Sequence, residues 1–158
     1  VGKQVTVVLN GVSKTLTTDA KGQATYAIGT KLAVKKYDAT VTFAGDDGYV
    51  KSTGTAKVTV NKAKSVLTAK KKTFKVKKAK KYSITLKSGK VAIKKVKLTL
   101  TGKFKGKKIK ITVKTDKKGK ATFNLKKLTK KGKFTATIKF AGNKYYNAAS
   151  KKAKITVK

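Results

Sequence analysis

Hydrophobic and polar residues alternate along most of this chain. The alternation is clearest at 96–100, 109–113 and 134–140, where apolar residues take turns with Thr, Lys or both. Successive side chains of a β-strand point to opposite faces, so a period of two indicates strands with one buried and one solvated face. In the second half of the chain the pattern predicts strands at 65–69, 73–77, 81–87, 94–101, 107–114, 120–125, 133–141 and 152–157.

Glycine, together with Asp or Lys, interrupts this pattern at 19–22, 45–48 and 116–119. We expect turns at these places, because glycine adopts positive φ without a steric cost and an Asp side chain bonds to the backbone two residues on. The segment 125–131 fits either one short helical turn or a solvated, lysine-rich loop.

The sequence contains an internal repeat. Residues 18–60 recur without a gap 97 residues later, so that 18–26 returns as 115–123. Self-similarity at a fixed period indicates a tandem array of similar units. We therefore predict two domains, an N-terminally incomplete unit at 1–62 and a complete unit at 63–158.

Short, evenly spaced strands without helical periodicity are typical of sandwich folds. The sequence predicts an all-β protein of tandem immunoglobulin-like antiparallel β-sandwiches, with seven or eight strands in a complete unit and no significant helix. A β-barrel is the weaker alternative.

The two copies differ at their front ends. Residues 63–92 have no counterpart ahead of Val1, so the first unit lacks its opening strands. The segment 5–9 aligns with 96–100 at an offset of 91, and a six-residue hairpin extension around 104–108 then raises the offset to 97. An open sandwich buries little apolar surface and exposes a sheet edge. We expect this unit to be completed by the chain preceding Val1 or by a strand donated from another molecule.

The composition excludes most catalytic and metal-binding chemistry. The chain has no Cys, His, Trp, Met, Pro, Arg or Glu, and its five acidic residues are all Asp. The missing types supply most metal ligands, nucleophiles and proton-transfer groups. We therefore predict that the protein is not an enzyme and has no catalytic, cofactor-binding or metal-binding residues.

The sequence shows no targeting or membrane segment. It contains no run of about 18 apolar residues, which a transmembrane helix would need, and Val1 does not begin a charged-then-apolar leader. It also begins without Met, inside a strand-like pattern. We expect an excerpt of a longer protein whose targeting signals lie outside it.

The positive charge is unevenly distributed. All 43 basic residues are Lys, and the net charge is +38. Residues 1–62 carry nine Lys and four Asp, a net charge of +5, whereas residues 63–158 carry 34 Lys and one Asp, a net charge of +33. Because the repeat is shared and the charge is not, the charge is a local specialisation or a compositional drift.

Three motifs occur in both copies: Thr-Asp-x-x-Gly-x-Ala-Thr-aromatic, an aromatic-Ala-Gly-Asp/Asn turn with a following Tyr, and a strand ending Lys-Val/Ile-Thr-Val. They lie at 18–26, 43–49 and 57–60, and again at 115–123, 140–146 and 154–157. Together they resemble bacterial-type immunoglobulin-like repeats. The lysine-saturated segment 125–134 is most similar to repeats of adhesin-like surface proteins from methanogenic archaea.

This resemblance implies extracellular modules at the cell surface or cell wall, strung into stalks with neighbouring repeats as partners. Binding and anchoring would be done by other domains of the chain. Such repeats indicate fold strongly and function weakly. Some related stalk domains form a Lys–Asn cross-link assisted by a buried acid, but the second unit has only Asp116, in a predicted turn. We predict no cross-link and an intact mass equal to that of the sequence.

A few polar and aromatic residues are candidates for binding. Asp46 and Asp47 fit a calcium loop or an ordinary Asp-Gly turn, and the turn is the better interpretation because the second copy has Asn143 and Lys144 there. We expect no metal at either position.

The acid kept in both copies, Asp19 and Asp116, is predicted to cap turn amides. Tyr145 and Tyr146 could stack on a sugar or base, but we expect one to close the end of the sandwich and the other to lie half exposed. Other aromatic residues fall on inward phases and are predicted to form core: Tyr26, Tyr37, Phe43, Phe123, Phe134 and Phe140.

The lysines allow three interpretations: a solvating coat, adhesion to anionic cell-wall or host-surface polymers, and nucleic-acid binding. Lysines alternate along nearly every strand, which favours a shell around the domain. The absence of Arg and of a recognition helix argues against specific nucleic-acid readout. The leading interpretation is a stalk or spacer module with a cationic surface, and the alternative is a polyanion-binding module.

Overall fold

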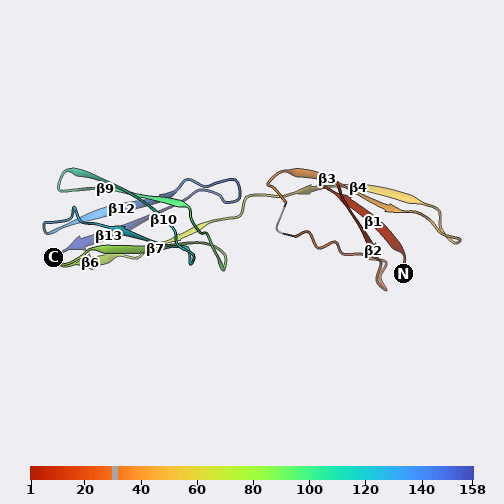
Figure 1. Cartoon of the computed structure of the whole chain (residues 1–158), viewed down its shortest axis with the longest axis horizontal. Coiled ribbons are helices and arrows are strands. Elements are labelled where there is room, and N and C mark those ends of the chain that lie inside the picture. Colours follow the sequence, from red (N-terminus) through yellow and green to blue (C-terminus); the bar gives the residue numbers. More distant parts are fainter. Residues whose placement is uncertain (30–31) are drawn as a thin grey trace. The chain divides into compact units, whose positions relative to one another are not determined.

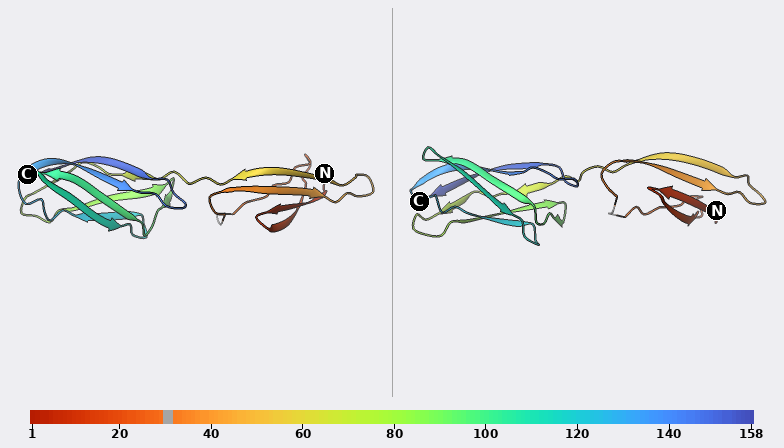
Figure 2. Two further views of the ribbon diagram at one scale, coloured as in Figure 1. Left: turned by 90° about the horizontal axis from the view of Figure 1, so that it is seen from above. Right: turned by 45° about the horizontal axis from the view of Figure 1, so that its top comes forward.

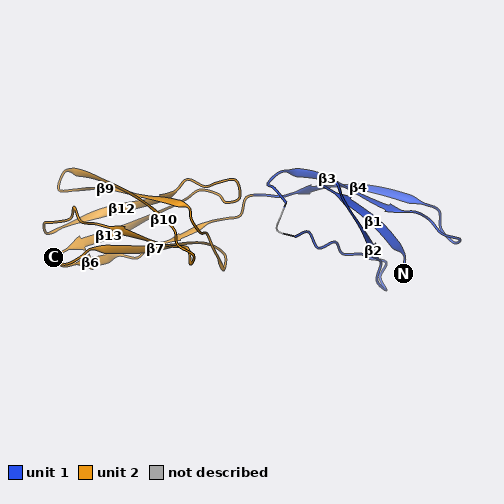
Figure 3. Ribbon diagram, in the orientation of Figure 1, with its two compact units in different colours: residues 1–61 blue, residues 62–158 orange. Residues whose placement is uncertain are grey.

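The protein is all-β. The computed structural model describes residues 1–29 and 32–158, and the regular structure within them consists of strands, without helix (Figure 1). Contacts divide the chain into two compact units, Val1–Asn61 and Lys62–Lys158 (Figure 3). The predicted fold class, tandem immunoglobulin-like β-sandwich repeats, is confirmed. No helix in the described part of the chain is long and apolar enough to cross a membrane.

The second unit contains two sheets (Figure 2). The five-stranded sheet has the order β10-β9-β12-β13-β6. Its strands are β6 (Lys72–Phe74), β9 (Lys97–Phe104), β10 (Lys107–Lys114), β12 (Gly132–Phe140) and β13 (Ala149–Val157). In the other sheet, of order β11-β7-β5, β8 also pairs with β7. Its strands are β5 (Val66–Thr68), β7 (Lys81–Ser88), β8 (Val91–Ala92) and β11 (Lys120–Asn124).

The core of the second unit contains the inward residues of both sheets. Leu86 and Phe123 from one sheet, and Leu98, Leu100 and Ile138 from the other, have no exposed surface. Burying one such side chain contributes about 1.5–3 kcal/mol. The alternation seen in the sequence therefore encodes the face that each strand presents to this core.

One pair of strands runs parallel. β6 pairs with β13, placing Lys72 beside Ile155 and Phe74 beside Val157. Backbone bonds continue past the ladder: Lys158 donates to the Phe74 carbonyl at 2.9 Å, and Val76 donates to the Lys158 carbonyl at 2.9 Å. A strand near the start of the unit is thereby joined to its last strand.

The segment 125–131 does not form a helical turn. It contains a tight turn in which Leu128 donates to the Leu125 carbonyl at 3.0 Å. It is not wholly a solvated loop either, because Leu125 and Leu128 are 1% and 0% exposed. The two leucines anchor the loop in the core while its lysines face water. The short strand β8 was not expected from the sequence.

The described residues of the first unit form a four-stranded antiparallel sheet, of order β2-β1-β3-β4. Leu9, Tyr37 and Ala39 form its buried cluster, with Tyr26 and Val58 among the half-buried residues packed against them. Its strands are β1 (Gln4–Leu9), β2 (Val12–Thr17), β3 (Lys36–Phe43) and β4 (Ser52–Thr59).

Equivalent positions are less buried in the first unit than in the second. Ile138 is 0% exposed, whereas Val41, its counterpart 97 residues earlier, is 37% exposed. Residues 23–27, the counterpart of β11, form no strand. In the second unit β11 pairs with β7, and no strand equivalent to β7 occurs within 1–29 or 32–61 of the first unit. Among the described residues of the first unit, the strands form one sheet.

The strand pairing corrects one alignment. Val7 pairs with Val41, and Leu100 pairs with Ile138, so β1 and β9 correspond at an offset of 93 rather than 91. The hairpin between β9 and β10 is therefore longer than that between β1 and β2 by four residues, not six. Gly2 (φ 68°) and Lys95 (φ 55°), both with positive φ, also match at 93.

Candidate functional site

The acid shared by both copies is a turn residue. The Asp116 carboxylate accepts bonds from the amides of Lys118 at 2.8 Å and Lys120 at 2.9 Å. Asp19 accepts the same pair of bonds from Lys21 at 2.8 Å and Gln23 at 3.0 Å. These amide bonds, that of Gln23 first for Asp19 and that of Lys120 first for Asp116, lower the pKa of each carboxyl group. Both acids shape a backbone turn.

Asp46 is held by a lysine. One of its carboxylate oxygens accepts a bond from the Lys3 ammonium at 2.5 Å, and the other accepts the Gly48 amide at 3.0 Å. The Lys3 bond is the main cause that lowers the pKa of Asp46. Lys3 also lies 5.0 Å from the centroid of the Tyr49 ring. Within the residues searched, no three metal-ligating side chains gather at one place.

The neighbouring tyrosines of the second unit have different environments. Tyr146 is half buried and packs against the core. Tyr145 is 49% exposed, and the Lys144 ammonium lies 4.9 Å from its ring centroid. The Asn143 side chain accepts bonds from the amides of both tyrosines, each at 2.9 Å. Asn143 thus takes the turn role of Asp46.

This tyrosine loop fixes the start of the second unit. Ala63 donates to the Tyr145 carbonyl at 2.8 Å and accepts from the Asn147 amide at 3.0 Å. The Ser65 hydroxyl also donates to the Asn147 carbonyl, at 2.5 Å. The sequence pattern did not predict this contact, because residues so far apart in the chain have no local signal that pairs them.

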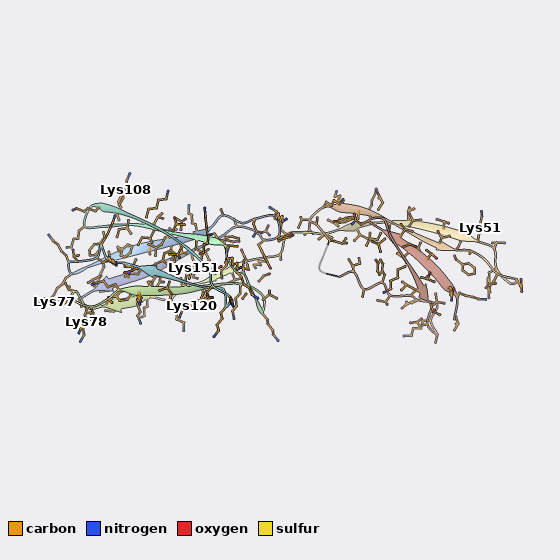
Figure 4. All side chains as sticks on the ribbon, in the orientation of Figure 1. Lys51, Lys77, Lys78, Lys108, Lys120 and Lys151 are labelled. Atoms are coloured by element: carbon orange, nitrogen blue, oxygen red, sulfur yellow. The ribbon has the colours of Figure 1, made fainter. Side chains whose placement is uncertain are left out.

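Most lysines point away from the sheets. Figure 4 labels Lys77, Lys78, Lys108, Lys120 and Lys151 of the second unit, all of which project from the ribbon into solvent. The ion pairs formed by the described residues all lie in the first unit, between Lys3 and Asp46 and between Lys57 and Asp38. Among the described residues, no ion pair therefore offsets the lysine charge of the second unit.

Two grooves meet at Lys71 and Lys72, beside the short strand β6. One groove, of about 450 Å³, is also lined by Lys70, Lys81 and Lys120. The other, of about 840 Å³, lies over β6, β12 and β13. Its further lysines are Lys133 and Lys154. We refer to the two together as the Lys71–Lys72 grooves. Lysine side chains therefore line both grooves.

One lysine of the second unit is buried. Lys80 is 7% exposed, and its ammonium donates to the carbonyl of Val76 and to that of Lys78, the latter at 2.9 Å. A buried ammonium is costly unless hydrogen bonds satisfy it. The two carbonyls supply such bonds, so Lys80 stabilises the turn between β6 and β7.

Neither a protein-family model nor a curated protein matches the sequence. Among solved structures, the chain is similar to a tetra-tandem repeat in the extending region of a large adhesion protein. The TM-score is 0.51 and the identity 17%, over 99% of this chain and 42% of that one. The chain thus spans less than half of that structure, and the likeness supports the fold.

Two further solved structures are more distant. One is a Ca²⁺-stabilised adhesin that helps an Antarctic bacterium reach out and bind ice, with a TM-score of 0.32, 18% identity, and coverage of 99% of this chain and 41% of that chain. The other is a 1.5-MDa bacterial ice-binding adhesin, with a TM-score of 0.34, 17% identity, and coverage of 99% and 53%. At these TM-scores they carry no argument about this protein.

Proposed function

We propose that the chain is a spacer module in the extracellular stalk of a cell-surface adhesin, with neighbouring repeats of a longer protein as its partners. The lysine-saturated segment 125–134 is the feature that associates it with adhesin-like proteins of methanogenic archaea. The contacts of its Asp side chains are hydrogen bonds within turns and ion pairs with lysines. We therefore propose no catalytic role for any residue.

The observation that carries this proposal is the parallel pairing of β6 with β13. In a stalk, tension would reach the second unit through its two ends. Two parallel strands pulled from opposite ends are loaded in shear, so that their backbone hydrogen bonds must break together. A unit with this topology resists tension better than one whose strands separate one bond at a time.

The connection between the units also suits a spacer. The first unit's last backbone bond near this point is donated by Val60 to the Lys35 carbonyl at 3.0 Å. The second unit's first backbone bond is that of Ala63 to the Tyr145 carbonyl. Only Asn61 and Lys62 lie between these bonded residues, which is shorter than a flexible linker.

Single-molecule pulling tests the proposal. Stretching the full chain by its ends should unfold the second unit in one resistant step, after which residues 62–158 contribute an extended length of about 330 Å, at about 3.4 Å per residue. Because the protein has no Cys, handles can also be attached through Lys71→Cys and Lys154→Cys, which lie beside each other across the pair. Pulling there should separate the strands at a markedly lower force. Equal forces in the two geometries would contradict the proposal.

A second candidate function is binding to anionic cell-wall or host-surface polymers, supported by the Lys71–Lys72 grooves. Lysine contacts bind polyanions by releasing counterions, whatever the polymer, and such binding weakens steeply with salt. Nucleic acid is the less favoured ligand, because Lys gives point contacts and no bidentate base recognition.

Salt titration tests the second candidate. The full chain would be bound to poly(glycerol phosphate), as a wall-polymer probe, and to duplex DNA of matched charge, with polylysine as the reference. Retained polymer binding at about 0.15 M salt, where the Debye length is about 8 Å, together with loss on Lys71→Gln/Lys72→Gln, is the expected result. Lys77→Gln/Lys78→Gln is the charge-matched control. Salt dependence that tracks polylysine for both ligands would leave the lysines as a solvating coat.

A further inference from the structure

Residues 63–93 cover the second unit along three edges. At the first edge, Ala63 bonds to the loop that contains Tyr145 and Asn147. At the second, β6 extends the sheet at β13. At the third, β7 pairs with β11, and the Leu86 amide donates to the Gly119 carbonyl at 2.8 Å. The same segment also supplies buried core residues: Leu67, Phe74, Tyr82, Ile84, Leu86 and Ile93.

The first unit presents the counterparts of all three edges. Its loop contains Tyr49 and Val50, which are 64% and 88% exposed. Its last strand, β4, is the edge of the sheet formed by the described residues. Residues 23–27, the counterpart of β11, belong to no strand. Unpaired strand edges of this kind are templates for pairing with another segment.

A glycine marks the place where a strand would approach. Gly119 has φ 71°, and a Cβ there would lie 2.5 Å from the Leu86 carbonyl oxygen. Its counterpart Gly22 has φ 72°, but a Cβ there would meet nothing within 4 Å. The space that β7 fills beside Gly119 is therefore open beside Gly22, and no strand of the described residues occupies it.

The apolar face of the first unit is correspondingly under-covered. Counterparts of fully buried residues are half buried or exposed in it, as for Val58 and Ile155, and for Ile28 and Leu125. In the second unit the covering sheet takes β5, β7 and β8 from residues 63–93.

We propose that the first unit is an acceptor for a polypeptide segment of the same sequence type as residues 63–93, joined directly ahead of Val1. The corrected offset of 93 makes Val1 the counterpart of Lys94, which directly follows this segment in the second unit. The segment lies parallel to β4, antiparallel to residues 23–27, and along the loop of Tyr49. This inference rests on the repeat and does not depend on the spacer function.

The test adds a copy of residues 63–93 in front of Val1 in the full chain. Hydrogen exchange would be followed at the amides of residues 24–27 and of Thr59, because the Gln23 and Val60 amides already donate to Asp19 and to the Lys35 carbonyl. Pairing of these residues should slow their exchange about tenfold or more, because exposed amides acquire hydrogen-bond partners. The control is a scrambled segment of the same composition, which keeps the added lysines. Equal protection by both segments, or by neither, would overturn the proposal.

Glycine substitutions distinguish binding of the added segment from folding of the first unit itself. Asn tolerates positive φ, so Gly22→Asn should leave the first unit of the unextended chain unchanged. In the extended chain it should abolish the added protection, because its side chain occupies the space of the incoming strand. Gly11→Asn, also at positive φ with nothing within 4 Å, is the matched control and should keep the protection. Full protection in the Gly22→Asn variant would overturn the assigned strand position.

A separate peptide tests how the segment is supplied. Residues 63–93 added as a free peptide lack the high effective concentration of a joined segment. At equimolar amounts the peptide should therefore protect residues 24–27 less than the fused copy does. Equal protection by the free peptide would show donation between molecules and contradict the placement ahead of Val1.

Discussion

The backbone amide of Leu86 donates to the carbonyl of Gly119 at 2.8 Å, and the strands lie so close that a Cβ on Gly119 would stand 2.5 Å from the Leu86 carbonyl oxygen. Glycine is therefore needed at position 119 for two reasons: the backbone there has a positive φ of 71°, and β7 leaves no room for a Cβ. The two requirements have different energetic costs and can be measured separately.

Gly119→Ala should destabilise the second unit by more than its backbone strain alone. The left-handed conformation costs a residue with a Cβ about 1–2 kcal/mol, and displacement of β7 adds to it. Gly106→Ala, with φ 77° and nothing within 4 Å, should show the strain alone. Denaturant unfolding followed by NMR signals of the second unit measures both free energies. Equal losses would mean that the close approach contributes nothing.

Matching core positions should respond unequally to truncation. Ile138→Ala should destabilise the second unit by about 2–5 kcal/mol, the usual cost of a cavity in a closed core. Val41→Ala, at the equivalent position but 37% exposed, should cost the first unit less than about 1 kcal/mol, because little buried contact is lost. The same unfolding experiment, read from signals of each unit, compares them. A larger loss of unfolding free energy for Val41→Ala than for Ile138→Ala would contradict the exposure of this face of the first unit.

The contact between Lys3 and Asp46 should be visible in a titration. The Lys3 ammonium lowers the pKa of Asp46 below its ordinary value of 3.8, so Lys3→Gln should raise that pKa towards 3.8. Carbon-detected NMR of the Asp46 carboxyl group measures the change. Lys57→Gln removes a lysine of the same unit that pairs with Asp38, and it should leave the Asp46 pKa where it is.

Acid should weaken the second unit partly through Asp116. Its folded-state pKa is lowered by the amides of Lys120 and Lys118, so the ionised carboxylate stabilises the fold above its ordinary pKa of 3.8. This stabilisation is lost as the pH falls through the folded-state pKa. Asp116→Asn keeps an acceptor oxygen but does not titrate. Its unfolding free energy should therefore fall less steeply below pH 3.8 than that of the native chain, as urea titrations at several pH values will show.

We expect the side chain of Lys80 to form no covalent cross-link. Its ammonium bonds to two backbone carbonyls, which accept its protons and offer no electrophilic side chain. The intact mass should equal the sequence mass, and a deficit equal to one ammonia would reveal a cross-link to Asn. Lys80→Met should destabilise the second unit by about 1–3 kcal/mol, because both carbonyls lose their bonds with the ammonium.

The strand positions of the second unit could be predicted because alternation is a direct consequence of strand geometry. The offset between β1 and β9 could not be predicted in this way. A shift of two residues leaves every side chain on the face that it had before, so the alternation does not change. Val5 aligned with Val96 and Val5 aligned with Leu98 are therefore equally good patterns. Only the pairing of Val7 with Val41 and of Leu100 with Ile138 decides between them.

The surface grooves and the contacts between distant residues were less predictable than the fold. The lysine shell follows from alternation, but the Lys71–Lys72 grooves depend on how β6 lies beside β13, a contact between distant parts of the sequence. The bond of Ala63 to Tyr145 is equally non-local. The turn roles of Asp19 and Asp116, by contrast, are local and were readable from Asp followed by Gly three residues later.

The parallel pairing of β6 with β13 also sets the order of events during synthesis. Phe74 leaves the ribosome long before Lys158, its backbone partner, so the unit stays open until its last residues emerge. Contacts between distant residues slow folding, and the half-made sheet exposes edges that could join another chain. Dense positive charge on a nascent segment repels its neighbours. The lysines that cover the finished unit would then protect the unfinished one from aggregation.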